Sequence, residues 1–168
     1  MSNDICKECL GGERAFLLGE IIHKFEQTIE SPIERKFLIG FLEVMNNAYI
    51  SLEEPDEGVF IATVRPGVGW KKVEVITLAP QVKIGRYRAD FVASFFEGTD
   101  LKISTVVECD GHDYHHATKE QVDRDNKKSS AIQEAGYSIM RFSGSRLYRD
   151  SYECASEVVS FLIKKGRE

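Results

Sequence analysis

The chain has 168 residues, of which 42% are hydrophobic, so one core of ordinary size can form without disulfides or a structural metal. No stretch approaches the roughly 20 apolar residues of a membrane span, and the first residues lack a secretory signal pattern, so we expect a cytoplasmic protein without membrane contact. The net charge of −5 does not exclude a polyanionic partner, because residues 1–60 hold 5 Lys or Arg against 12 Asp or Glu, whereas residues 61–168 hold 17 against 15.

Four cysteines are too few and too scattered for a disulfide framework, which agrees with a reducing compartment. Only Cys6 and Cys9 have the spacing of metal ligands. A structural zinc site needs four ligands, and no second pair of this kind follows. We therefore interpret Cys6 and Cys9 as thiols without a metal, with a zinc site as the alternative.

Two helices are predicted in the first 45 residues. Apolar residues recur at helical spacing over residues 13–29. Ser31 and Pro32 are typical of an N-cap and a first helical turn, and the apolar positions that follow continue a second helix to residue 45. Residues 51–70 contain several Gly and Pro residues and predict a loop with one short strand.

A sheet is predicted from residue 73 onward, and its first strands are joined by short turns, which is typical of an antiparallel meander. Thr118 and Gln121 form a capping-box pattern at the start of a helix, and Gly136 is suited to the left-handed residue at its end. The order is α-α-β-β-β-α-β-α. The predicted elements are strands over residues 73–78 with 81–84, 87–96, 101–109 and 137–142, and helices over 118–136 and 151–164.

Acidic residues lie near the open end of the hairpin formed by residues 87–109. If residues 98–100 form a three-residue loop, paired residue numbers add up to 198, and Asp90 stands opposite Glu108 with Asp110 on the same face. Facing carboxylates repel and lose hydration, so this register requires a cation, and Mg²⁺ with its oxygen ligands is the simplest candidate. A two-residue loop would separate the acids, and an acid that faces solvent at a strand end needs no metal.

The residues around this hairpin resemble a known family. Asp90, followed about twenty residues later by Glu108, Cys109 and Asp110, resembles the core motif of the PD-(D/E)XK nuclease superfamily. The wider pattern is similar to the branch of small proteins that resemble very-short-patch repair endonucleases. The run comprises Gln81, Ile84, Gly85, residues 87–91, residues 108–115, Gly136, Tyr137, Arg141 and Phe142, and the helix start at Ser31 and Glu34 extends it.

This resemblance implies an α/β (α+β) fold, in which a central mixed sheet is flanked by helices around a restriction-endonuclease-like α-β-β-β-α-β core. One nuclease-like domain would span residues 1–168, with an N-terminal helical extension (1–30), the core (31–142) and a C-terminal helix (143–168). The implied activity is a DNA endonuclease that depends on Mg²⁺ or Mn²⁺ and hydrolyses phosphodiester bonds by attack of a metal-activated water. The alternative is a catalytically degenerate nucleic-acid-binding module of the same fold.

The resemblance also assigns roles to residues. Asp90 would be the central metal ligand, and Glu108 and the backbone carbonyl of Cys109 match the other ligand positions. The catalytic set also includes Asp110, which replaces the usual lysine of Glu-x-Lys, so no lysine can orient the attacking water from that position. His115 matches the proposed general base of the very-short-patch branch, while zinc binding and an ordinary loop histidine are the alternatives.

Glu34 has two interpretations. With Ser31 it completes a capping box, yet it also lies on the buried stripe of its helix, and the family often takes an acid from this helix. Basic residues near the site predict phosphate contacts, although a solvated surface explains any single one. A protein partner or a homodimer could supply specificity. The predicted nucleic-acid contacts are Arg88, His112, Arg124, Lys128 and Arg141.

Overall fold

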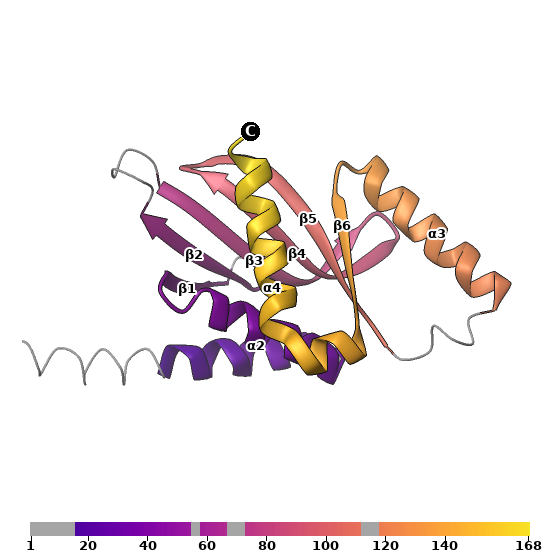
Figure 1. Ribbon diagram of the computed structural model, residues 1–168, viewed down its shortest axis with the longest axis horizontal. Helices are drawn as coiled ribbons and strands as arrows, with labels where there is room; N and C mark the ends of the chain where they lie inside the picture. The colour runs from indigo at the N-terminus through magenta and orange to yellow at the C-terminus, as the bar shows by residue number, and fades with distance from the viewer. Residues whose placement is uncertain (1–15, 55–57, 67–72, 112–117) are drawn as a thin grey trace, which may run out of the picture.

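The computed structural model describes residues 16–54, 58–66, 73–111 and 118–168, and it contains a six-stranded mixed sheet flanked by helices (Figure 1). The predicted fold class is therefore confirmed. The strands follow one another across the sheet in chain order; β5 and β6 are parallel, and all other neighbours are antiparallel. The elements are α2 (Pro32–Val44), β1 (Tyr49–Glu53), β2 (Phe60–Pro66), β3 (Val73–Ile84), β4 (Tyr87–Glu97), β5 (Asp100–Asp110), α3 (Lys119–Glu134), β6 (Ser138–Ser143) and α4 (Gly144–Gly166).

The one short strand predicted within residues 51–70 corresponds to β2, whereas β1, which begins before this range at Tyr49, was not predicted. β1 is an edge strand that pairs only with β2, so its polar residues remain partly exposed and give no apolar pattern. β2 is anchored in the sheet by buried Ile61 and by Thr63, whose hydroxyl donates a 2.8 Å hydrogen bond to the Ile76 carbonyl.

The helix boundaries follow their predicted capping residues. The Ser31 side chain accepts a hydrogen bond from the backbone N–H of Glu34 at the start of α2, and Gly136 has the expected positive φ, 89°, just after α3. Residues 16–26 are helical, within the predicted range of 13–29. The last helix begins at Gly144 rather than at residue 151, since Ser143 caps an extra segment that ends in a kink at Asp150.

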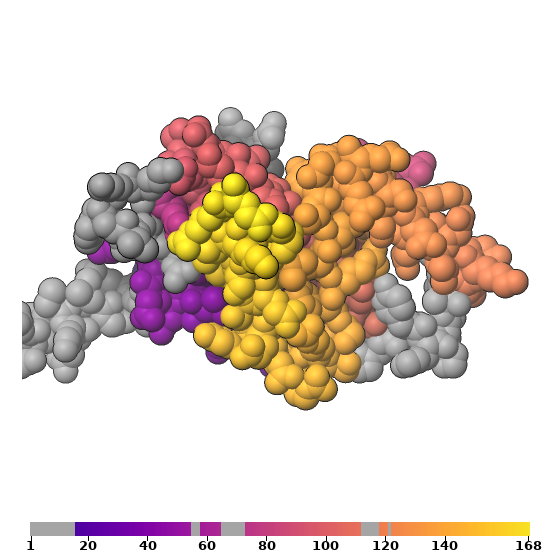
Figure 2. Space-filling model, turned by 45° about the horizontal axis from the view of Figure 1, so that its top comes forward, coloured from indigo at the N-terminus to yellow at the C-terminus, as the bar shows by residue number. Residues whose placement is uncertain are grey.

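The two faces of the sheet carry different helices. α2 and α4 cover the main core, which contains Phe37, Phe91 and Val107, whereas Ile132 of α3 packs against a smaller cluster on the other side. Figure 1 shows α2 and α4 together and α3 beside β6, and Figure 2 shows α4 in yellow next to the orange surface of α3 and β6.

α2 and α4 approach each other closely at one glycine. A Cβ atom added to Gly40 would lie 2.3 Å from the backbone oxygen of Ser151, so only glycine fits at this crossing. No helix in the described ranges is long and apolar enough to cross a membrane. Apolar residues of both helices pack against the sheet in the main core.

Candidate active site

The β4–β5 hairpin does not have the predicted three-residue loop. Glu97 pairs with Asp100, which leaves a two-residue turn, and the paired numbers there add up to 197. A β-bulge follows, in which Lys102 is the extra residue on β5 and Phe95 pairs with Ile103. The bulge therefore adds back the residue that the shorter turn removes.

The predicted register is confirmed beyond the bulge. Paired numbers add up to 198 from Phe95 to Phe91, which pairs with Val107 at the end of the ladder. Continued one position past the end of the ladder, the same register would set Asp90 against Glu108. The turn was predicted wrongly, but the bulge compensates for that error before the strands reach the acidic residues.

The neighbouring β3–β4 ladder is interrupted opposite Asp90. Pro80 pairs with Phe91 and Val82 pairs with Ala89, whereas no pair joins Gln81 to Asp90. Gln81 has a φ of 53°, a left-handed conformation that a non-glycine residue seldom adopts and that costs of order 1–3 kcal/mol. Such irregularities re-aim side chains and are frequent next to active sites.

Asp90 is mostly buried, and its carboxylate accepts one hydrogen bond, 2.7 Å long, from the backbone N–H of Cys109. The pKa of Asp90 is raised from 3.8 to about 6, chiefly by burial and also by the negative charges of Glu108 and Glu34, against the opposing effects of the Cys109 N–H and of Lys128. Asp90 is therefore a carboxylate whose charge is only partly compensated by the protein.

Glu108 is only 5% exposed, and its two oxygens have different surroundings. Oε2 accepts a 2.6 Å hydrogen bond from the Lys128 ammonium group of α3, whereas Oε1 is buried without a hydrogen-bond partner in the described part of the chain. Burial raises the pKa of Glu108, while Lys128 and then Arg141 act in the opposite direction. An unsatisfied buried carboxylate oxygen is costly, and such an atom calls for an explanation such as an ion.

Asp110 lies beside Arg141 of β6. Its Oδ1 is 3.8 Å from Arg141 Nη1, and Arg141 Nη2 donates a 2.9 Å hydrogen bond to Ser129 Oγ on α3. Arg141 is also the residue that pairs with Glu108 in the parallel ladder between β5 and β6. The position where the family motif has a lysine is thus an acid paired with an arginine.

Glu34 takes part in the helix cap and also lies near the site. Its Oε1 accepts a hydrogen bond from Ser31 Oγ at 2.8 Å, and its Oε2 accepts from the backbone N–H of Glu30 at 3.1 Å and from Gln81 Nε2 at 2.6 Å. The capping interpretation is correct, and the interaction with Asp90 shows that Glu34 also faces the acidic group. Its oxygens are already satisfied, so the uncompensated charge lies on Asp90 and Glu108.

The donor chemistry of Asp90 and Glu108 fits a hard divalent cation. Both supply carboxylate oxygens, the ligands that Mg²⁺ prefers, and the buried Oε1 of Glu108 lacks any other partner. Within the described ranges, no three His, Cys, Asp or Glu side chains are grouped closely enough to hold a metal ion. Cys109, whose backbone carbonyl is the third predicted ligand, directs its thiol into the main core, where burial raises its pKa far above the usual range.

The residues predicted to contact nucleic acid differ in exposure and in partners. Arg88 is half-exposed and forms an ion pair with Glu30, and Arg124 is exposed on α3. Lys128 and Arg141, also predicted as nucleic-acid contacts, are held by the acids described above. His112, His115, Cys6 and Cys9 lie outside the described residues.

The sequence interpretation did not find two of these contacts. It assigned Lys128 a contact with nucleic acid and gave Gln81 no role. The sequence did contain a signal for Lys128, because it lies four residues before Ile132, the buried residue of α3, and residues at this spacing share a helix face. For Gln81 there was none, because a left-handed glutamine within a strand has no sequence pattern.

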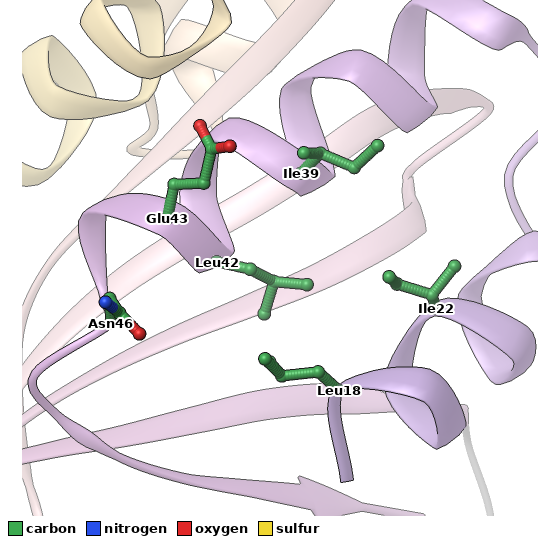
Figure 3. A pocket seen from close by; sticks show the side chains of 6 residues that line it. All are labelled: Leu18, Ile22, Ile39, Leu42, Glu43 and Asn46. Atoms are coloured by element: carbon green, nitrogen blue, oxygen red, sulfur yellow. The ribbon is translucent and has the colours of Figure 1, made fainter. Parts of the chain in front are cut away.

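A hollow of about 310 Å³ lies between helical residues 16–26 and α2. In Figure 3, Leu18, Ile22 and Leu42 point into a shared space. None of the carboxylates around Asp90 lines it, and an apolar hollow with a single acid cannot perform hydrolytic chemistry. The candidate active site is therefore the group of acids near the start of β4 and the end of β5. The hollow is lined by Leu18, Ile22, Ile39, Leu42, Glu43 and Asn46.

Residues 71–162, more than half of the chain, match the model of the family REase_MTES_1575, a restriction-endonuclease-like family. The match covers β3 to β6 with α3 and most of α4, and therefore includes Asp90, Glu108 and Lys128 but neither Glu34 nor the predicted zinc ligands Cys6 and Cys9. No curated protein and no solved structure matches the chain. The chain belongs to the REase_MTES_1575 family, and membership in a restriction-endonuclease-like family indicates a nuclease.

Proposed function

We propose that this member of the restriction-endonuclease-like family REase_MTES_1575 is a DNA endonuclease that depends on Mg²⁺ or Mn²⁺. The observation that carries the proposal is Glu108, a buried carboxylate with one oxygen lacking a partner among the described residues, close in the sheet to Asp90, whose pKa is raised to about 6 chiefly by burial. Two such acids in a nuclease fold require a cation when both are ionised. The match does not extend to the very-short-patch branch, so the proposal stays at the level of a metal-dependent nuclease.

Asp90 and Glu108 would hold the metal, together with the backbone carbonyl of Cys109. When bound there, a divalent ion would supply a Lewis acid for stabilising negative charge on a phosphate and for lowering the pKa of water. The chain itself contributes positioning. The Cys109 N–H fixes Asp90, Lys128 fixes Glu108, and the closed sheet-helix layers around them limit hydration of both acids.

Phosphodiester hydrolysis by this site requires a water that attacks phosphorus and a group that takes its proton. His115 remains our prediction for that base, because an imidazole titrates near neutral pH and the residue follows the metal strand by a short segment. Arg124 on the exposed side of α3 and Arg88 at the edge of the site are the predicted phosphate contacts.

Cleavage assays on a panel of labelled DNAs test this proposal. Supercoiled, duplex, mismatched, branched and single-stranded DNA should be incubated with Mg²⁺ or Mn²⁺, with EDTA as the negative condition. We expect metal-dependent cleavage by the wild type and its loss in Asp90→Asn and Glu108→Gln. Asp100→Asn is the matched control, because Asp100 is exposed at the opposite end of β5 and should cut like the wild type.

The second candidate function is a nucleic-acid-binding module without catalysis. It is favoured by Asp110, which occupies the usual lysine position and is engaged by Arg141. If the wild type binds DNA at the same affinity with Mg²⁺ and with EDTA and cuts none of the panel, this module is the better description. Equal cutting by Asp90→Asn and wild type would instead show that the active site has been wrongly assigned.

A further inference from the structure

Two adjacent lysines of α3 have different environments. Lys127 is exposed and forms an ion pair with Asp123 on its own helix, at 2.6 Å. Lys128 lies on the face that also carries buried Ile132, and its side chain is only 21% exposed. The helix therefore turns Lys128 toward the sheet and leaves Lys127 in solvent.

The contact of Lys128 is specific. Its ammonium group donates to Glu108 Oε2 at 2.6 Å, with the Glu108 side chain only 6% exposed. Burying two charges costs hydration, which the pair recovers only when the remaining polar atoms are also satisfied. Here Oε1 of Glu108 has no partner among the described residues, so the ion pair should contribute little to stability. It is instead suited to orienting Glu108 so that the carboxylate can bind a further cation.

We propose that Lys128 is a positioning residue of the active site, which holds Glu108 through Oε2 and leaves Oε1 for a divalent cation. This inference rests on the proposed function. The ammonium group reaches Glu108 from a helix, whereas the family motif would place a lysine two residues after Glu108 on the same strand, where this chain has Asp110. Lys128 acts through Glu108 and takes no direct part in the reaction.

A simple phosphate contact by Lys128 would have different consequences. A lysine that only binds DNA should raise KM when replaced and reduce the salt dependence of binding by about one charge, with no effect on metal affinity. A positioning lysine should instead change the metal affinity and the rate at saturating DNA, because its partner is the metal ligand.

The experiment compares Lys128→Gln, Lys128→Arg and the matched control Lys127→Gln in the full-length protein. Gln removes the charge but retains a donor for Glu108, so the fold should survive, which thermal unfolding verifies. Mn²⁺ affinity is measured by titration without DNA, and the single-turnover rate at saturating DNA is measured on whichever substrate the wild type cuts.

In Lys128→Gln we expect Mn²⁺ affinity and the single-turnover rate to fall by about 10–100-fold, the usual effect of removing a group that orients a metal ligand. KM for DNA should stay near the wild-type value, Lys128→Arg should recover part of both losses, and Lys127→Gln should match the wild type. Unchanged or tighter Mn²⁺ binding in Lys128→Gln would overturn the proposal, as would a loss confined to KM.

Two further outcomes are decisive. If Lys128→Gln does not fold, Lys128→Met carries the test, because methionine keeps the apolar stem without the charge or the donor: a lower Mn²⁺ affinity with unchanged KM supports positioning, and a wild-type Mn²⁺ affinity overturns it. If the wild type cuts no DNA, the proposed function fails, but the Mn²⁺ titration still decides whether Lys128 orients Glu108. A wild type that binds no Mn²⁺ overturns both.

Discussion

Removing the charge of Asp90 should stabilise the protein in the absence of metal. Burial and two neighbouring acids raise the pKa of Asp90 from 3.8 to about 6, so the folded state binds its proton more tightly than the unfolded state. The stability that this proton provides is fully present below pH 4 and is lost as pH rises through 6. A shift of about two pKa units corresponds to roughly 3 kcal/mol. The Asp90→Asn variant keeps an oxygen that can accept the Cys109 N–H and carries no charge.

At pH 8 in EDTA, Asp90→Asn should therefore be more stable than the wild type by up to roughly 3 kcal/mol. For a chain of this size each kcal/mol moves Tm by roughly 2–4 °C, so Tm should rise by roughly 6–12 °C. Near pH 4 the difference should disappear. Asp100→Asn, at the exposed end of β5, should change Tm little at either pH.

Bound metal should reduce or reverse this difference in stability between Asp90→Asn and the wild type. A cation at one hundred times its Kd stabilises the wild type by about 2.7 kcal/mol, and the variant that has lost the ligand should gain much less. Calorimetry across pH 4–8, with and without Mg²⁺, measures all these differences. The electrostatic reasoning is refuted if Asp90→Asn is no more stable than the wild type at pH 8 in EDTA while it remains equally stable at pH 4.

Three other changes should separate the roles of the site residues. Glu108→Gln should weaken Mg²⁺ binding, and raising the pH should not restore cleavage, because the variant lacks a metal ligand at every pH. His115→Ala should retain Mn²⁺ binding but lose roughly 10²–10⁴ in rate. The rise of rate with pH through the histidine range should flatten in this variant, and a wild-type profile would show the histidine to be a bystander. Deleting Lys102 should remove the bulge yet keep Phe95 opposite Ile103, so metal binding should persist. A deletion variant that folds but no longer binds metal would contradict this role of the bulge.

Much of the fold could be predicted from the sequence because the signals for its helix boundaries are local. Ser31 with Pro32 marked the start of α2, and Gly136 marked the end of α3, since capping and positive φ depend on single residues. The edge strand β1 was missed because partial exposure gives no clear alternation of apolar residues. The turn at Gly98 was predicted one residue too long, because no sequence pattern distinguishes a short turn with a bulge from a longer loop without one.

The site was predictable as a set of acids but not as a set of contacts. The spacing of Asp90 and Glu108 on paired strands follows from the period of a sheet, and the register outside the bulge agrees with it. The partners of those acids come from other elements. The Cys109 N–H, Lys128 and Gln81 reach them through the packing of β5, α3 and β3, which a single sequence does not encode in any short pattern.

The position of the cation at Glu108 illustrates why a motif read along one strand can be incomplete. A carboxylate that must stay ionised inside a sheet needs a positive group within hydrogen-bond distance, and chemistry does not specify which element supplies it. In this chain the strand position holds Asp110, which engages Arg141, and the ammonium group comes from α3 at 2.6 Å. An acid at position 110 alone is therefore insufficient reason to regard the site as inactive, because tertiary packing brings another ammonium group to Glu108.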